Sequence, residues 1–170
     1  MDVHDKKTRS KNMRAIKSRD TQPEIILRKA IHKKGLRYRI CPADVPGKPD
    51  LYFPKYNAAI FVHGCFWHVH SCEYFRLPAT RTEFWREKLN GNVRRDKKVL
   101  EELQHMGIRG LIVWECSLKG KHRLPDGMPA ILAVTWLKSG VIAGVIDQSG
   151  LTNKSSATKI SEDLKIIQPC

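Results

Sequence analysis

The stretch from Ile60 to Cys72 limits what this chain can fold into more than any other part of it. It reads IFVHGCFWHVHSC and holds three of the seven histidines and two of the five cysteines. An apolar run over residues 58–62 leads into it, which predicts a buried strand. Imidazole and thiolate groups at this density favour a metal site over a disulfide in a chain without secretory features. We therefore expect a strand that ends in a metal-binding loop.

The candidate metal ligands are three clustered residues and one remote residue. Cys65, His70 and Cys72 follow a C-x4-H-x-C spacing, and Cys116 ends a second apolar run. A structural zinc ion needs four ligands in a tetrahedron, so this set would pin the loop to the sheet. Buried free thiols, or a disulfide between Cys65 and Cys72, are the alternatives. The spacing alone leaves open whether His68 or His70 is the ligand.

The charge of the chain points to nucleic acid as its partner. Its 170 residues carry a net charge of +14, and the first 40 hold thirteen Lys and Arg against four acidic residues. Such an excess favours DNA or RNA over an acidic protein. No apolar run is long enough to cross a membrane and no leader is recognisable, so we expect a cytoplasmic protein without membrane association. A monomer is expected because no dimer surface is recognisable.

Residues 1–20 are expected to form a basic arm that binds DNA. Ser10 can cap a short helix that runs to Arg19, with Met13 as one of its few apolar side chains and Lys11 and Arg14 among its cations. Its apolar face is too thin for firm docking, so the arm would become ordered on DNA. A merely solvated charged helix is the alternative.

The rest of the chain predicts one α/β domain over residues 21–138, with a polar tail of open role over 139–170. A capping box at residues 21–24 starts a helix that Gly35 ends. The later elements are a strand near residues 36–40, a hairpin over 51–62, a helical region over 80–106 with one break near Gly91, a buried strand over 111–114 and a helix over 128–138. This order predicts a mixed sheet flanked by helices.

Asp50 is the candidate metal-binding carboxylate. It follows Pro49 and opens a strand whose hairpin partner ends at His63. This arrangement resembles the core of the type II restriction-endonuclease fold, although Phe61 and His63 stand where that fold normally has an acid and a lysine. A carboxylate at a strand end is a natural Mg²⁺ ligand, and a nearby histidine can act as a general base. An aspartate that only caps a loop is the alternative.

Six motifs in order resemble the very short patch repair (Vsr-type) DNA mismatch endonucleases. They are DVHDK at residue 2, TRSKNMRAI at 8, PGKPD at 46, FVHGCFWH at 61, PATRTEFW at 78 and VWEC at 113. The resemblance implies an enzyme that nicks one strand of duplex DNA 5′ to the thymine of a T·G mismatch arising from 5-methylcytosine deamination. It also implies a bacterial, nucleoid-associated setting and a functional link to a DNA cytosine-5 methyltransferase.

Motif by motif, the resemblance assigns roles to individual residues. It places catalytic Mg²⁺ on Asp50 and the backbone carbonyl of Val62, with His68 as the candidate base and His63 assisting beside the phosphate. Glu24 matches a further acidic position needed for activity. The resemblance gives structural Zn²⁺ to Cys65, His70, Cys72 and Cys116, and DNA wedges to Phe66, Trp67, Trp85 and Met13.

The chain departs from the family pattern in three places. Val62 replaces a more familiar threonine, Val69 replaces a histidine, and residues beyond Gly120 match no pattern. Two other functions compete with the mismatch endonuclease. One is a non-catalytic, zinc-stabilised DNA-binding module, which would not need Asp50. The other is a restriction-type nuclease that cuts both strands, which would need Asp50 and usually a dimer.

Overall fold

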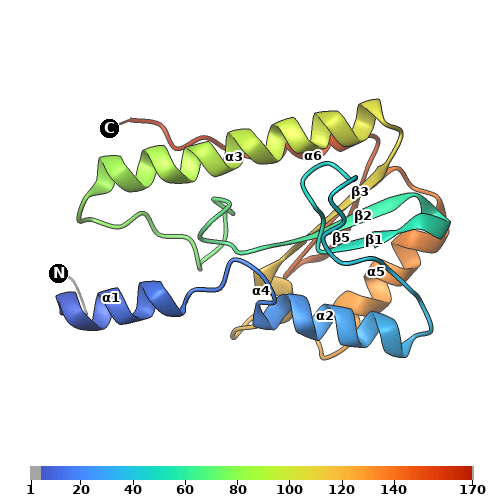
Figure 1. The fold of residues 1–170 in the computed structure, drawn as a ribbon, viewed down its shortest axis with the longest axis horizontal. Coiled ribbons are helices and arrows are strands. Elements are labelled where there is room, and N and C mark those ends of the chain that lie inside the picture. The colour runs from blue at the N-terminus through green and yellow to red at the C-terminus, as the bar shows by residue number, and fades with distance from the viewer. Residues whose placement is uncertain (1–4, 170) are drawn as a thin grey trace.

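A computed structural model describes residues 5–169 and shows a mixed five-stranded sheet (Figure 1). The strands stand in the order β1 (Leu51–Phe53), β2 (Ala58–His63), β3 (Arg109–Trp114), β4 (Ala143–Asp147) and β5 (Gly150–Lys154). The pairs β1–β2 and β4–β5 are antiparallel, whereas β2–β3 and β3–β4 are parallel. The predicted mixed sheet is therefore present, and the three central strands run in one direction.

The central strand β3 is buried on both faces, as its continuous apolar sequence predicts. Leu111 and Val113 point into one hydrophobic cluster, and Ile112 and Trp114 point into another on the opposite face. The register pairs His63 of β2 with Trp114 of β3. The two strands therefore end side by side, and the residues that follow each of them lie at one edge of the sheet.

Helices cover both faces of the sheet (Figure 1). On one side lie α2 (Gln22–Lys33), the short α4 (Glu115–Leu118) and α5 (Met128–Ser139), whose apolar residues complete the first cluster. On the other side α3 (Thr82–His105) lies beside α6 (Ala157–Asp163). Among the described residues no helix combines the length and the apolar character needed to span a membrane.

The local predictions hold best where the hydrophobic pattern is strong. The hairpin over 51–62, the strand over 111–114 and the helix over 128–138 are confirmed. The helix break expected near Gly91 is wrong. Helix α3 is continuous, and its buried residues before and after Gly91 lie on the same face of the helix. The strand expected over 36–40 is reduced to one isolated bridge, between Arg39 and Tyr52. The backbone that follows it turns away at Cys41, which has a positive φ of 47°.

The N-terminal arm forms a helix that stands apart from the sheet (Figure 1). This helix, α1 (Lys6–Ala15), begins five residues earlier than expected because Asp5 rather than Ser10 is its N-cap: the Asp5 carboxylate accepts a hydrogen bond from Thr8 N at 2.6 Å. None of its residues is buried. The arm is therefore held by few contacts, in agreement with its thin apolar face. Residues 1–4 lie outside the described residues.

Residues 139–169 differ from the loosely held polar tail that the sequence predicts. They contain β4 and β5, which complete the sheet, and α6, which packs on α3. The Asn90 side chain of α3 also bonds both backbone groups of Ile167, at 2.8 and 3.0 Å. β5 lies at the sheet edge with few buried residues, so its sequence reads as polar. The α/β domain therefore extends past residue 138 to the end of the described chain.

This architecture predicts that the C-terminal segment is needed for folding and the arm is not. Deleting residues 140–170 should abolish cooperative thermal unfolding, since it exposes the edge of β3 and one face of α3. Deleting residues 1–15 should change the melting temperature by no more than a few degrees, because α1 buries no residue. Circular dichroism melts of the two truncations test this. A cooperative melt of the C-terminal truncation near the wild-type temperature would contradict it.

Candidate active site

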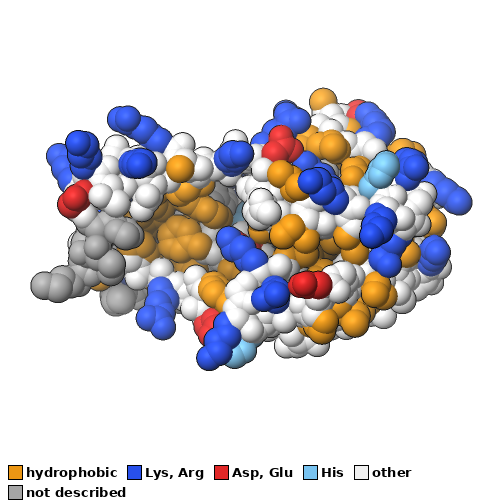
Figure 2. All heavy atoms as spheres, turned by 90° about the horizontal axis from the view of Figure 1, so that it is seen from below, with side chains coloured by type: hydrophobic (Ala, Val, Ile, Leu, Met, Phe, Trp, Pro, Cys, Tyr) orange, Lys and Arg blue, Asp and Glu red, His pale blue; other side chains and the backbone are white. Residues whose placement is uncertain are grey.

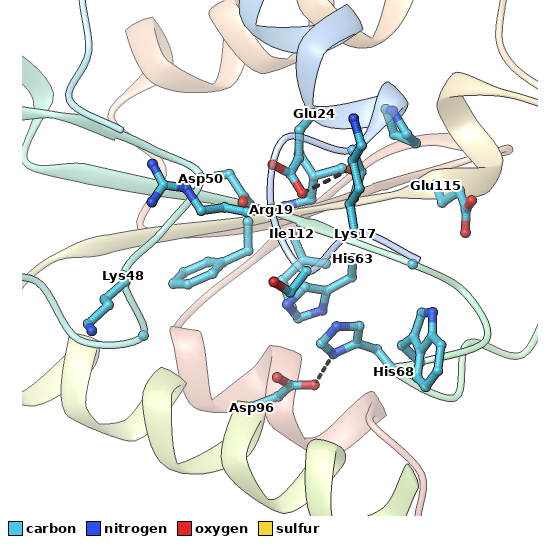
Figure 3. A pocket seen from close by; sticks show the side chains of 18 of the residues that line it. Lys17, Arg19, Glu24, Lys48, Asp50, His63, His68, Asp96, Ile112 and Glu115 are labelled. Carbon is cyan, nitrogen blue, oxygen red and sulfur yellow. Dashed lines mark hydrogen bonds and ion pairs between the residues drawn. The ribbon is translucent and has the colours of Figure 1, made fainter. Parts of the chain in front are cut away.

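A cleft of about 1080 Å³ opens where β1 and β2 meet, between the start of α2 and the middle of α3. Its walls carry Glu24, Asp50, His63, His68 and Asp96, which come from five separate elements or loops (Figure 3). Lys and Arg side chains border it from the arm, α3 and the neighbouring loops: Lys17, Arg19, Lys48, Arg95 and Lys119. An anion entering this cleft would therefore meet cations on several sides.

Asp50 sits directly before β1, on the inner wall of the cleft. Its Oδ2 accepts a hydrogen bond from the backbone N–H of Val62 at 2.6 Å, so the antiparallel hairpin fixes the carboxylate against β2. Burial, together with the nearby Glu24 carboxylate, raises the pKa of Asp50 to about 6 despite that hydrogen bond. A carboxylate that is costly to ionise is well suited to a divalent cation, which supplies a compensating positive charge.

His63 and His68 stack face to face, with ring centroids 3.8 Å apart and planes 7° apart. His63 is only 7% exposed, and both its burial and the neighbouring His68 hold its pKa well below the usual value. It is therefore neutral at physiological pH. Its Nδ1 is buried and has no hydrogen-bond partner among the described residues. A buried polar atom without a partner is unusual, which marks His63 as a candidate functional residue.

Asp96 is a site residue that the sequence analysis missed. Its Oδ2 lies 2.6 Å from Nδ1 of His68, and this pair is drawn as a dashed line in Figure 3. The contact fixes the ring and leaves Nε2 of His68 as the nitrogen without this partner, the arrangement of a general base oriented by a carboxylate. One signal was present: Asp96 is the only acid within the basic run Arg94–Lys98 on α3.

Glu24 belongs to a buried ionic network at the start of α2. Its Oε2 accepts hydrogen bonds from the backbone N–H of Asp20 at 2.9 Å and from Arg28 at 3.1 Å, and its Oε1 accepts one from the Thr21 hydroxyl. Arg28 also contacts the Asp20 carboxylate at 2.6 Å, which lowers the pKa of Asp20. The capping box also predicts that the Thr21 side chain accepts a hydrogen bond from a backbone N–H of the first helical turn, and this bond is absent. The network joins the base of the arm to the cleft.

The expected DNA wedges from the loop and α3 form one aromatic cluster. The ring centroid of Phe66 lies 5.1 Å from that of Trp67 and 5.5 Å from that of Trp85, and all three side chains are partly exposed. The ammonium group of Lys88 lies over both indole rings, at 5.5 and 5.6 Å. Asn92 anchors the loop by donating to the Trp67 carbonyl at 3.0 Å. Partly exposed rings beneath a cation form a surface on which a base can stack.

The other DNA-binding candidates lie on α1, outside the lining of the cleft. Lys11 and Arg14 line a small basic surface with Lys6, Lys7 and Ser10, and Met13 is 40% exposed. A space-filling view shows a hollow with a hydrophobic floor and with Lys and Arg side chains along its rim (Figure 2). Such a surface combines apolar contact area with cations for a phosphate backbone.

The four cysteine and histidine candidates for zinc converge, as the sequence predicts. The ligand atoms of Cys65, His70, Cys72 and Cys116 all lie within 4.8 Å of one another. Nδ1 of His70 lies 3.7 Å from Cys65 Sγ and 3.6 Å from Cys116 Sγ. Bonds of about 2.3 Å to sulfur and about 2.0 Å to nitrogen at tetrahedral angles place such atoms about 3.6 Å apart. The cluster therefore fits a metal ion, and all four cysteines that are described are free thiols.

Contacts between the thiols of the cluster shift the pKa values of Cys65 and Cys116 in opposite directions. The Cys65 thiol lies against Cys116, and this contact, with help from His70, lowers the pKa of Cys116 to about 5. The same contact raises the pKa of Cys65. A bound cation would favour the ionised form of all three thiols.

The backbone at Val69 directs neighbouring histidines to different sites. Val69 has a φ of 55°, which is unusual for a β-branched residue and stores strain in the loop. The turn is held by a hydrogen bond from His70 N to the Cys65 carbonyl at 2.9 Å. His68 then points into the cleft towards Asp96, and His70 points to the thiols. The structure thus groups His70 with the three thiols, and His68 with His63 and Asp96.

Comparisons with known proteins agree with this geometry. The family model described as DNA mismatch endonuclease Vsr matches residues 1–74. The chain is 47% identical over 150 residues to the DNA mismatch endonuclease Vsr of Escherichia coli strain K12, an alignment that covers 88% of this chain and 96% of that protein. This chain belongs to the Vsr family of DNA mismatch endonucleases. It is accordingly a nuclease that acts on DNA and a DNA repair enzyme.

Other relatives of this Vsr family member are named nicking enzymes. The type II nicking enzyme V.NmeAIP of Neisseria meningitidis serogroup A is 42% identical over 71% of this chain and 86% of its own length. The type II nicking enzyme V.NaeI of Lentzea aerocolonigenes is 43% identical over 73% of this chain and 74% of its own length. The family assignment confirms the resemblance drawn from the six motifs and supports a nuclease over the non-catalytic binding module.

The contact between His68 and Asp96 predicts a loss of rate without a loss of binding. Asp96→Asn keeps a group of the same shape but favours the wrong tautomer of His68. Single-turnover cleavage of a mismatched duplex should fall on the order of a hundredfold or more. Affinity for the duplex should stay within about twofold. Glu101→Gln, an exposed acid on the same helix, is the matched control. Wild-type cleavage by Asp96→Asn would remove Asp96 from the active site.

Proposed function

We propose that this Vsr family member nicks one strand of duplex DNA 5′ to the thymine of a T·G mismatch, in a reaction that depends on Mg²⁺. The observation that carries the proposal is a partly buried carboxylate, Asp50, beside the oriented pair His68–Asp96, in a cleft bordered by cations. The names of the relatives support mismatch recognition and nicking. Deamination of 5-methylcytosine produces T·G pairs, so a DNA cytosine-5 methyltransferase is the expected functional partner.

Asp50 and the carbonyl of Val62 would hold the Mg²⁺ ion. Val62 is supported as a ligand position because its backbone lies directly against the Asp50 carboxylate. Replacement of threonine by valine leaves a carbonyl ligand in place. When bound, Mg²⁺ supplies charge stabilisation at the scissile phosphate and favours ionisation of bound water. The protein contributes a fixed carboxylate and cations around the cleft.

The histidines would divide the remaining work between proton transfer and positioning. His68 accepts the proton of the attacking water, and the Asp96 carboxylate holds its ring and stabilises the resulting imidazolium. His63 stays neutral because it is buried, and its open Nδ1 would find a partner in the substrate or its water. Glu24, held by Arg28, adds negative charge on the Asp50 side of the cleft.

Recognition would rest on the aromatic cluster and the arm. A T·G pair is less well stacked than a matched pair, so Phe66, Trp67 and Trp85 can enter beside it at a cost of a few kcal/mol of unstacking. Met13 on α1 would enter from the opposite groove. The Cys65, His70, Cys72 and Cys116 cluster would hold a structural Zn²⁺ that keeps Phe66 and Trp67 in place. A monomer would suffice, since only one strand is cut.

Separate labelling of the two strands tests the proposed reaction. Wild-type enzyme with Mg²⁺ should cut only the thymine strand of a T·G duplex and leave the T·A duplex intact. Asp50→Ala should abolish nicking but still prefer T·G DNA, because the aromatic cluster remains. Trp67→Ala should lose stacking worth about 1–3 kcal/mol, so mismatch preference falls before the maximal rate does. Single-turnover nicking and competition binding measure the two effects.

Three outcomes would contradict the proposal. Nicking at the wild-type rate by Asp50→Ala would remove Asp50 from the active site. Cutting of both strands, or of matched duplex at one sequence, would favour a restriction-type nuclease. Equal nicking in EDTA would exclude a role for Mg²⁺.

The proposed role of the arm predicts a change in salt dependence. Deleting residues 1–19 removes seven Lys and Arg residues and Met13. The slope of log affinity against log salt is negative, and its magnitude falls by about 0.9 for each phosphate that is no longer neutralised by a Lys or Arg. The truncated protein should show a shallower slope on plain duplex and weaker preference for T·G DNA. Charge reversal at exposed Lys138 of α5, far along the chain from the cleft residues, should leave the slope unchanged. An unaltered slope after truncation would show that the arm does not contact DNA.

A further inference from the structure

The β4–β5 turn lies against the cysteine–histidine cluster, in a segment whose role the sequence leaves open. Asp147 pairs with Gly150, so Gln148 and Ser149 alone form the turn. Oδ1 of Asp147 accepts a hydrogen bond from Ser149 N at 2.7 Å. Oδ2 lies 4.0 Å from Nε2 of His70. One oxygen therefore fixes the carboxylate to the turn, and the other faces the histidine.

The two nitrogens of His70 have different surroundings. Nδ1 faces the sulfur atoms of Cys65 and Cys116 at 3.7 and 3.6 Å, and Nε2 faces Asp147. The ring also stacks on Trp114, with centroids 4.2 Å apart and planes 15° apart, so it cannot turn freely. A metal ion on Nδ1 requires the proton on Nε2, where the carboxylate can stabilise it directly or through one water.

The same turn reaches a second ligand of the cluster. The backbone N–H of Gln148 faces the Cys116 thiol and helps to lower the pKa of Cys116. Asp147 is part-buried, with 31% of its side chain exposed, so a substitution there leaves the packed core intact. Both contacts come from a hairpin more than thirty residues beyond the last ligand in the sequence.

We propose that Asp147 is a positioning residue for the metal cluster: it orients His70 and holds the proton on Nε2 while Nδ1 binds the ion. The inference rests on the proposed structural zinc. It explains why the C-terminal hairpin ends where β2 and β3 end, and it gives residues 139–169 a part in the site as well as in the sheet.

Three variants of the full-length, zinc-loaded protein separate charge from turn geometry. Asp147→Asn keeps an Oδ1 that can accept from Ser149 N but removes the charge, and Asp147→Ala removes both. Asp163→Asn is the matched control, since it breaks an exposed ion pair with Lys154 on the same segment. Zinc transfer to a competing chelator and the visible spectrum of the Co²⁺-substituted protein are measured.

The Asn and Ala variants should both retain zinc about 10–100-fold less tightly, the usual cost of losing such a partner, with a shifted Co²⁺ spectrum. The control should stay within about twofold of wild type. Wild-type retention by Asp147→Asn together with weaker retention by Asp147→Ala would show a turn role only and overturn the proposal. A protein that holds no zinc would overturn it together with the zinc assignment, while strand-specific nicking, measured separately, would stand.

Discussion

The parallel pairing of β2 with β3 is the constraint on which both sites depend. His63 stands opposite Trp114 in the register, so Cys65 and Cys116 each follow two residues after a paired position. The thiols of Cys65 and Cys116 can therefore meet, and the loop that follows Cys65 closes around His70. The same register places His63 beside the cleft. A slip of one residue would turn alternate side chains to the wrong face and separate the metal ligands. Apolar residues on both faces of β3 oppose such a slip.

Two candidate metal sites of different chemistry then lie close together without sharing a ligand. The Asp50 side offers oxygen atoms, which suit Mg²⁺, and the cysteine cluster offers sulfur and nitrogen, which suit Zn²⁺. Val69 lies between their histidines in the chain. Its left-handed backbone conformation directs the His68 side chain to Asp96 and the His70 side chain to the thiols. Strain at this residue is acceptable because the loop is tied at several points, among them a hydrogen bond from Cys65 N to Glu115 at 3.1 Å.

Sequence reasoning found the parts of the site that are close together in the chain. The loop ligands and Asp50 carry local signals, namely spacing, a preceding proline and an apolar strand. Asp96 and Asp147 carry almost none, because each reaches the site from an element that only the fold brings near. β5 was missed for a related reason: an edge strand needs few apolar residues, so pairing with β4 rather than composition determines it. The prediction of a helix break at Gly91 was wrong because the buried face of α3 continues on both sides of that residue.

The ionic network around Arg28 joins the arm to the wall of the cleft. Asp20 adopts a positive φ of 55° at the junction of arm and domain, a conformation that aspartate tolerates at modest cost. Its N–H is held by Glu24, which lines the cleft, and its carboxylate is held by Arg28. A buried arginine between two acids is stable only while both remain in place. The junction at Asp20 is therefore tied, through Arg28, to the position of Glu24 in the cleft wall.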